Sequence, residues 1–192
     1  MKKTLLGATL MLGAALSAQA DESRPFKFLL GAGLTFGGDT LVTVQFDDGH
    51  SEDVDGGGLV HLYAGAEYRL GTAVSLQATL GYHVDNSTGS NGSVRFSRMP
   101  VDLLAHYHVN DQVRLGAGVQ FVNNPELKGS GDASDVNVKF DSATGTILEG
   151  EYLFSPSAGV KLRYVAEKFK LSGGGGAEAD GNHFGIMLNY YF

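Results

Sequence analysis

The sequence predicts an all-β protein, specifically a transmembrane, eight-stranded, antiparallel up-and-down β-barrel. Three observations indicate this fold. Eight segments of the chain alternate apolar and polar side chains with the two-residue period of a strand. The connections between them are alternately short and long, as in a series of hairpins. Aromatic residues on the apolar faces gather near the ends of the segments, as they do at the two interfaces of a bilayer.

The first 20 residues are typical of a secretory signal peptide. Two lysines are followed by an apolar run over residues 5–16 and by a small-x-small cleavage site that ends at residue 20. The run is too short to span a bilayer comfortably, which disfavours a membrane anchor. We therefore expect a signal peptide at residues 1–20 and a single outer-membrane β-barrel domain at residues 21–192.

The first four strand segments read FLLGAGLTF, VHLYAGAEYRL, VSLQATLGYHV and VDLLAHYHV. In each, large apolar residues or alanine occupy every second position, and glycine, histidine, hydroxyl or charged residues lie mostly between them. Because side chains alternate across a strand, each segment has one apolar and one polar or small face. These strands are expected at residues 28–36, 60–70, 74–84 and 101–109.

The last four strand segments follow the same rule and read VRLGAGVQF, LEGEYLF, VKLRYVAEK and FGIMLNYYF. They are expected at residues 113–121, 148–154, 160–168 and 184–192. An open edge cannot face lipid, because its backbone groups would lack hydrogen-bond partners. The last strand is therefore expected to pair with the first and close the sheet.

The connections predict one simple end and one elaborate end of the barrel. Short hairpin turns are expected at residues 71–73, 110–111 and 155–157. Long loops, rich in Gly, Asp, Asn and Ser, are expected at residues 37–58, 85–93, 123–145 and 170–181. Two alternating stretches inside these loops, 40–46 and 136–140, are shorter than the roughly 9–11 residues of a spanning strand. The alternation leaves open whether they extend neighbouring strands or form extra strands.

The aromatic residues indicate that the apolar face contacts lipid. A soluble barrel would instead bury that face. In a soluble core, no physical effect would gather aromatic residues at two levels along the barrel axis. The aromatics near the short turns are Phe28, Tyr68, Tyr107, Tyr152, Phe154, Tyr190 and Phe192. Those near the long loops are Phe36, Tyr82, Phe121 and Phe184.

The opposite face should line a narrow lumen. It combines small residues with charges of both signs, and unpaired charge in such a place is unfavourable. We therefore expect the charged side chains to pair and fill the lumen. The expected lumen network comprises Glu67, Arg69, Asp102, Arg114, Glu149, Glu151, Lys161, Arg163 and Glu167.

With these features, the chain resembles the small eight-stranded outer-membrane β-barrels of Gram-negative bacteria, the class of OmpX and the OmpA transmembrane domain. The resemblance extends over about residues 26–192, and its most specific element is the final strand. Phe192, Tyr190 and Leu188 match the terminal pattern of the family, which implies that they signal to the barrel-assembly machinery. The resemblance also implies periplasmic turns and termini, external loops, and an outer-membrane location among lipids and lipopolysaccharide.

Composition limits the function classes. Without residues 1–20, the chain has 12 Lys and Arg against 21 Asp and Glu, a net charge of −9, which argues against nucleic acid as a partner. With no cysteine, it has neither disulfides nor a Cys-linked lipid anchor. We expect a monomer with a structural or surface-interaction role and a plugged lumen. The alternative is a narrow channel for small solutes or small hydrophobic molecules; a lipid-modifying enzyme is less favoured.

No catalytic residue, cofactor or metal site is predicted. His106 and His108 share one strand face, but no third metal ligand is indicated by spacing. The acidic stretch 47–58 begins to resemble a calcium loop, yet Leu62 stands where that pattern needs an acid. Interior hydroxyl groups lack an evident base partner, which disfavours a hydrolase. These features are better explained as lumen packing and a solvated loop.

Overall fold

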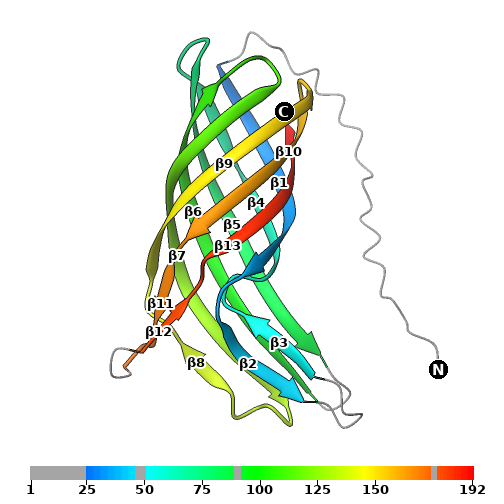
Figure 1. Cartoon of the computed structure of the whole chain (residues 1–192), viewed down its shortest axis with the longest axis vertical. Helices are drawn as coiled ribbons and strands as arrows, with labels where there is room; N and C mark the ends of the chain where they lie inside the picture. The colour runs from blue at the N-terminus through cyan, green and yellow to red at the C-terminus, as the bar shows by residue number, and fades with distance from the viewer. Residues whose placement is uncertain (1–24, 46–50, 89–91, 174–176) are drawn as a thin grey trace, which may run out of the picture.

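The computed structural model describes residues 25–45, 51–88, 92–173 and 177–192. These residues form a closed eight-stranded antiparallel barrel with further short strands at one end (Figure 1), which confirms the predicted fold class. Among them, no helix has the length and apolar character needed to cross a membrane. The expected signal peptide lies outside the described residues. The barrel strands are β1 (Phe26–Gly37), β4 (Leu59–Arg69), β5 (Val74–Thr88), β6 (Gly92–His108), β7 (Val113–Gly131), β9 (Ala143–Ser155), β10 (Ala158–Ala166) and β13 (His183–Tyr191).

The first and last barrel strands pair along their length, as predicted. Strand β13 runs antiparallel to β1, with Tyr190 opposite Leu30 and Phe184 opposite Phe36. The pairing continues to the chain end, where the Phe192 backbone N–H donates to the Phe28 carbonyl oxygen over 2.9 Å. The remaining neighbours pair in order around the barrel, and β6 with β7 completes the circle. The short connections lie where they were expected, between β4 and β5, β6 and β7, and β9 and β10.

Four barrel strands extend well beyond their predicted ends. The intervals 85–93 and 123–145 were expected to be loops, but β5 continues to Thr88, β6 begins at Gly92, β7 continues to Gly131 and β9 begins at Ala143. Asp85 pairs with Phe96, and Phe96 pairs with Leu127 on the other side. Hydroxyl, Asn and Gly residues interrupt the apolar alternation here, which is why the sequence pattern suggested loops.

We call the structure beyond the barrel mouth the crown. It comprises these strand extensions and five short strands, β2 (Thr40–Gln45), β3 (Ser51–Asp55), β8 (Asn137–Lys139), β11 (Lys168–Lys170) and β12 (Glu178–Asp180). Strand β2 pairs only with β3, and β8 adds a ninth strand beside β7. The stretches 40–46 and 136–140 are thus extra strands, although residue 46 itself lies outside the described residues. Residues 51–55, expected in a solvated loop, form β3.

The crown has its own apolar core. Its buried members are Val54, Val94, Phe96, Val122, Leu127 and Phe169. The rings of Phe96 and Phe169 meet edge to face with centroids 5.6 Å apart. Strands far apart in the chain supply these residues, so the crown is held together by tertiary packing.

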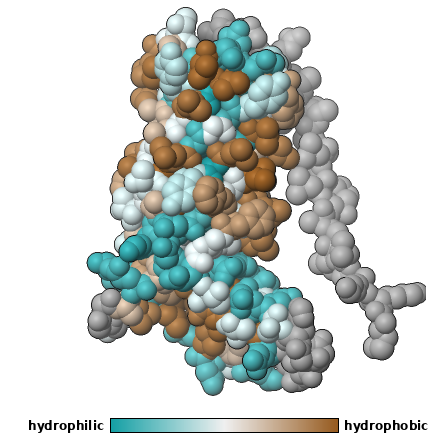
Figure 2. All heavy atoms as spheres, in the orientation of Figure 1, coloured by the Kyte–Doolittle hydropathy of each residue, from teal (hydrophilic) through white to brown (hydrophobic). Residues whose placement is uncertain are grey.

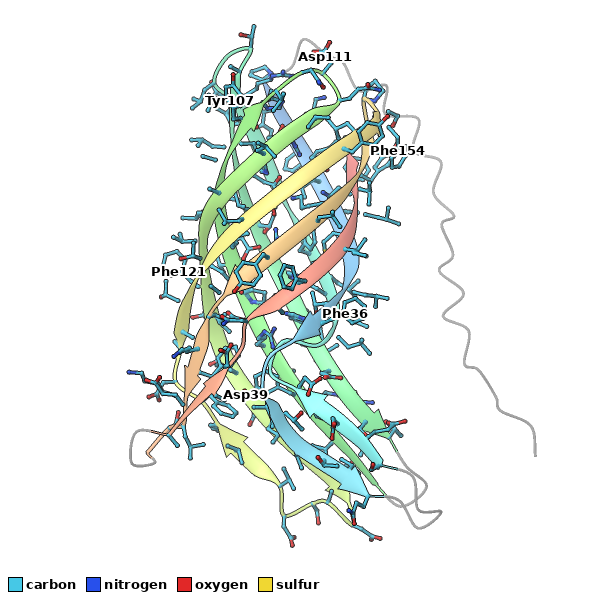
Figure 3. The ribbon with its side chains drawn as sticks, viewed as in Figure 1. Phe36, Asp39, Tyr107, Asp111, Phe121 and Phe154 are labelled. Atoms are coloured by element: carbon cyan, nitrogen blue, oxygen red, sulfur yellow. The ribbon has the colours of Figure 1, made fainter. Side chains whose placement is uncertain are left out.

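The outside of the barrel is apolar and the inside polar, as the aromatic positions predicted. Leu162 and Phe184 point outward with 63% and 66% of their surface exposed. In Figure 2, apolar residues cover much of the barrel wall, and hydrophilic residues are prominent on the crown. Figure 3 shows Tyr107 and Phe154 near the short turns and Phe36 and Phe121 nearer the crown. The two groups of aromatics flank an aliphatic band of the kind that spans a bilayer.

Candidate functional site: the barrel lumen

The structure buries eight of the nine charged residues expected in the lumen. All but Glu167 lie on strand positions that alternate with lipid-facing residues, so the pleat of each strand points them inward. Several strands also place glycine inward, including Gly31 and Gly116, which leaves room for the long side chains. The eight are Glu67, Asp102, Arg114, Glu149, Glu151, Lys161, Arg163 and Glu167.

Arg114 organises the part of the lumen nearest the short turns. Its Nε and Nη2 atoms donate to Glu151 Oε2 over 2.9 and 2.7 Å. Glu151 lies directly opposite Arg114 on β9, so strand register makes this pair. Arg114 also donates to Glu67 and to the Tyr191 hydroxyl from across the lumen. The Tyr191 hydroxyl in turn donates to Glu151, which closes the group.

Glu149 and Arg163 organise the middle of the lumen. They are register neighbours on β9 and β10, and Arg163 Nε donates to Glu149 Oε2 over 2.9 Å. Arg163 Nη1 also donates to Asp102 Oδ2 over 2.6 Å. Lys161 Nζ lies 2.6 Å from Glu149 Oε1 and 4.0 Å from Glu151 Oε2. Lys161 therefore connects this group to the Arg114 group, and together they form one network of ion pairs.

Arg69 differs from the sequence expectation. Its side chain turns to the end of the barrel and donates to the carbonyl oxygens of Gly71 and Thr72, over 3.2 and 3.1 Å. The residue lies last in β4, beside the short turn, so those carbonyl groups are nearer than any central acid. Arg69 thus stabilises the turn and does not join the central pairs.

Arg98 is a buried charge of the upper lumen that the sequence pattern did not predict. It is fully buried, and its Nη1 donates to the Gly56 carbonyl oxygen while Nη2 lies 3.6 Å from Glu167 Oε1. Its guanidinium also lies over the Phe96 and Phe169 rings of the crown core, 5.3 and 5.4 Å from their centroids. Arg98 continues the inward alternation of β6, but the predicted strand began at residue 101. A predicted strand that began at Gly92, as β6 does, would have placed Arg98 among the inward-facing charges.

Glu167 lies just beyond the spanning strand β10, and its surroundings favour the neutral acid. Burial raises the pKa of Glu167 to about 7, although Arg98 acts in the opposite direction. Neither carboxyl oxygen has a hydrogen-bond partner among the described residues. The ion pair with Arg98 is therefore weaker than the bonded pairs deeper in the lumen.

The two histidines considered as metal ligands have other partners. His106 Nε2 lies 2.7 Å from Glu149 Oε1, and His108 Nε2 lies 2.9 Å from the Ser75 hydroxyl. His106 thus joins the ion-pair network through Glu149, and His108 pairs with a hydroxyl group on β5. As positioned, no group of three His, Cys, Asp or Glu residues within the described parts of the chain is arranged to hold a metal ion.

Paired charged side chains thus occupy the lumen, and the crown occupies the mouth above it. Arginine paired with two carboxylates at once fixes the side chains that would have to move for a wide passage to form. An apolar exterior that exposes large side chains is unfavourable in water and favourable in lipid. Fold and site together define a membrane-spanning β-barrel whose interior holds paired charged side chains.

Comparison with known proteins agrees with this class. The family model for the outer membrane protein beta-barrel domain matches residues 6–192, and the chain belongs to this family. The family places the protein in the outer membrane. A comparison with curated protein sequences finds no match.

Two solved structures illustrate the shared fold. The attachment invasion locus protein Ail of Yersinia pestis, in complex with the heparin analogue sucrose octasulfate, superposes with a TM-score of 0.56 at 12% identity, covering 88% of this chain and 100% of that chain. Neisserial surface protein A superposes with a TM-score of 0.53 at 10% identity, covering 88% of this chain and 98% of that one. At these identities the likeness concerns the fold alone.

Proposed function

We propose that this protein is a non-conducting, monomeric, non-enzymatic outer-membrane barrel with a structural and surface-interaction role, in which the barrel displays the crown. The observation that carries the proposal is the continuous filling of the lumen. Ion pairs extend from Arg114 through Lys161 to Arg163, and Arg98 links the upper lumen to the crown core. Opening such a path would leave charges buried without partners, which is strongly unfavourable.

The partners follow from the two surfaces. The apolar band would contact outer-membrane lipid, and the polar crown would meet lipopolysaccharide headgroups and the medium. During export, residues 1–20 would be removed, and Phe192, Tyr190 and Leu188 would engage the barrel-assembly machinery. The alternating, aromatic final strand supports this assembly role, since it also closes the barrel.

Planar-bilayer recording tests the filled lumen. We expect no steady conductance from the wild-type protein, and stepwise current from Arg163→Ala, which removes a cation that pairs with both Asp102 and Glu149. Glu149→Ala should act in the same direction. Lys128→Ala removes an exposed crown ion pair with Glu126 and serves as the matched control.

Persistent large currents from the wild-type protein would contradict the proposal and favour the channel alternative. An unchanged, silent Arg163→Ala variant that still folds would show that the ion pairs do not close the lumen. Mass spectrometry of lipid A from cells with and without the protein should give the same profile, and a difference would indicate an enzyme.

A further inference from the structure

A groove of about 560 Å³ lies on the outer side of the wall, where the barrel meets the crown. Residues of β9, β10, β11 and β12 line it, and Figure 1 shows β11 and β12 continuing β10 and β13 into the crown. Thr144, one of the lining residues, is exposed and shares a face of β9 with the lipid-facing Leu148. The volume is typical of a small-molecule site, since such pockets hold roughly 300–1,000 Å³.

The groove begins directly above a pair of aromatic residues at the crown side of the lipid-facing band. Tyr164 and Phe184 are register neighbours on β10 and β13, and their ring centroids are 4.7 Å apart. Ala166 lines the groove two residues beyond Tyr164, on the same face of β10. Asn182 lines it two residues before Phe184. Aromatic rings of a membrane barrel lie at the level of the lipid headgroups, so the groove opens at that level.

The groove lining combines donors for phosphate with partners for sugar hydroxyl groups. Lys168 and Lys170 flank the buried Phe169 on β11, so both side chains point to the outer face. Ser142 and Thr144 add hydroxyl groups at the start of β9. Lysine is a common phosphate ligand, and hydroxyl groups both donate and accept hydrogen bonds. The lining therefore suits a phosphorylated sugar.

Two acidic residues also line the groove, and neither excludes an anionic ligand. The Glu178 carboxylate lies 3.3 Å from Lys170 Nζ and 4.0 Å from Lys168 Nζ. The lysine side chains are 65% exposed and the Glu178 side chain is 41% exposed, and ion pairs with such exposure are weak. A doubly charged phosphate can therefore displace Glu178. The second acid, Glu167, is buried, and Arg98 Nη2 lies 3.6 Å from its carboxyl group.

We propose that this groove binds the phosphorylated sugar headgroup of a membrane glycolipid, with Lys168 and Lys170 on the phosphate and the acyl chains along Tyr164 and Phe184. The inference rests on the proposed function, in which the crown meets lipopolysaccharide headgroups. A free anion would contact only the lysines, and an apolar molecule would leave them unmatched. A phosphorylated glycolipid matches both the charge of the lysines and the aromatic rings that continue into the lipid-facing band. Lipid A, the membrane anchor of lipopolysaccharide, has this chemistry.

Native mass spectrometry of the full-length mature protein in detergent tests the site. After incubation with bisphosphorylated lipid A, the wild-type barrel should retain one lipid. Dephosphorylated lipid A should bind roughly tenfold more weakly, because each lysine near an anionic lipid contributes about fivefold. A large excess of inorganic phosphate should not displace lipid A, because a free anion lacks the contacts of the sugar and the acyl chains.

Three variants locate the site. Lys168→Gln/Lys170→Gln should weaken binding of lipid A roughly tenfold or more, for the same electrostatic reason. Glu178→Gln removes the competing carboxylate and should strengthen binding several-fold. Lys128→Gln/Lys139→Gln is the matched control, because it removes the same charge from exposed lysines of β7 and β8 that do not line the groove. Heat-dependent gel migration confirms that each variant is folded.

Equal binding of lipid A and its dephosphorylated form would overturn the proposal. Displacement by inorganic phosphate would also overturn it, since the groove would then be a simple anion site. Equal losses in the two double variants would show that net charge alone attracts the lipid, which refutes the groove as the site. If Lys168→Gln/Lys170→Gln does not fold, Glu178→Gln decides, and unchanged binding there refutes the site.

The recordings in planar bilayers separate this site from the proposed function. A silent wild-type barrel without preference for phosphorylated lipid would refute the glycolipid site alone. Large currents from a barrel that still prefers phosphorylated lipid A would refute the filled lumen alone.

Discussion

At the scale of single residues, the lumen depends on small side chains beside large ones. Gly31 faces the ring of Tyr63 and the side chain of Asn189, and a Cβ atom at this position would overlap both. Tyr63 is itself tied to Asn189 by a hydrogen bond, so the ring has little freedom to move aside. Gly31 has an ordinary strand conformation, so backbone freedom does not explain why glycine is needed here. The close approach of the Tyr63 and Asn189 side chains does.

We therefore expect Gly31→Ala to destabilise the folded barrel by about 1–3 kcal/mol, the usual range for an overpacked interior. Urea unfolding in detergent micelles, followed by far-UV circular dichroism, measures the loss. Gly71→Ala is the matched control, since a Cβ there meets no atom within 4 Å. Equal stability of the two variants would mean that the interior near Tyr63 is looser than the structure indicates.

We expect Glu167 to make the free energy of unfolding of the barrel depend on pH. Its pKa is raised from 4.5 to about 7 in the folded protein, so between these values the folded chain keeps a proton that the unfolded chain releases. The contribution of Glu167 to stability must then fall as pH rises from about 4.5 to 7, by about 3 kcal/mol at most. Glu167→Gln should remove this part of the slope. A slope identical in both proteins would show that Glu167 does not titrate in this range.

At the scale of elements, the strands are longer than a bilayer requires. Strands β6 and β7 have 17 and 19 residues, against the roughly 9–11 that span a membrane. The surplus carries the Phe96 and Leu127 side chains into the crown, where they meet Phe169 of β11. The crown is thus a packed unit built on strand extensions, with an apolar core separate from the lipid-facing band.

Removal of the Phe169 ring should open the crown and leave the barrel intact. Phe169→Ala deletes a fully buried side chain from the crown core. The cavity that it leaves should reduce the stability of the crown by about 3–5 kcal/mol. Limited proteolysis should then cut the crown much faster, while a heat-modifiable barrel fragment persists. The control is Phe184→Ala, which lies on the lipid face. Unchanged proteolysis of Phe169→Ala would mean that the ring contributes little to the crown.

At the scale of the whole molecule, closure joins the two ends of the domain. The pairing of β1 with β13 gives the final residues backbone partners, and the Phe192 ring also meets that of Tyr190, with centroids 4.9 Å apart. Phe192 can therefore act in two ways, through packing in the folded barrel or through recognition during assembly. The two roles make different experimental predictions.

We expect deletion of Phe192 to reduce assembly in cells far more than it reduces the stability of protein refolded in detergent. Membrane fractionation with heat-dependent gel migration measures the first effect, and urea unfolding measures the second. Phe154→Ala, another exposed aromatic near the short turns, is the control and should change assembly little. Proportionate losses in both assays would show that Phe192 serves only packing.

The sequence alone determined the fold class, the strand order, the short turns and the direction in which each strand faces. Strict alternation predicts a strand, because successive side chains of a strand point to opposite faces. Aromatics at two heights predict which face meets lipid, because they gather at the two interfaces of a bilayer. The same alternation identified Arg114, Glu149 and Arg163 as inward-facing charges. It was insufficient where polar residues continue a strand, as at Asp85.

The tertiary structure decided which groups meet. Arg69 and Arg98 lie at opposite ends of the lumen, and only the contacts of their side chains show that one stabilises a turn while the other links lumen and crown. The ring contacts of His61, His83 and His183 likewise require β4, β5 and β13 to come together, although the first and last of these residues are 122 positions apart in the sequence. Contacts between distant segments depend on strand register and on the conformations of long side chains, and alternation within one strand carries no information about either.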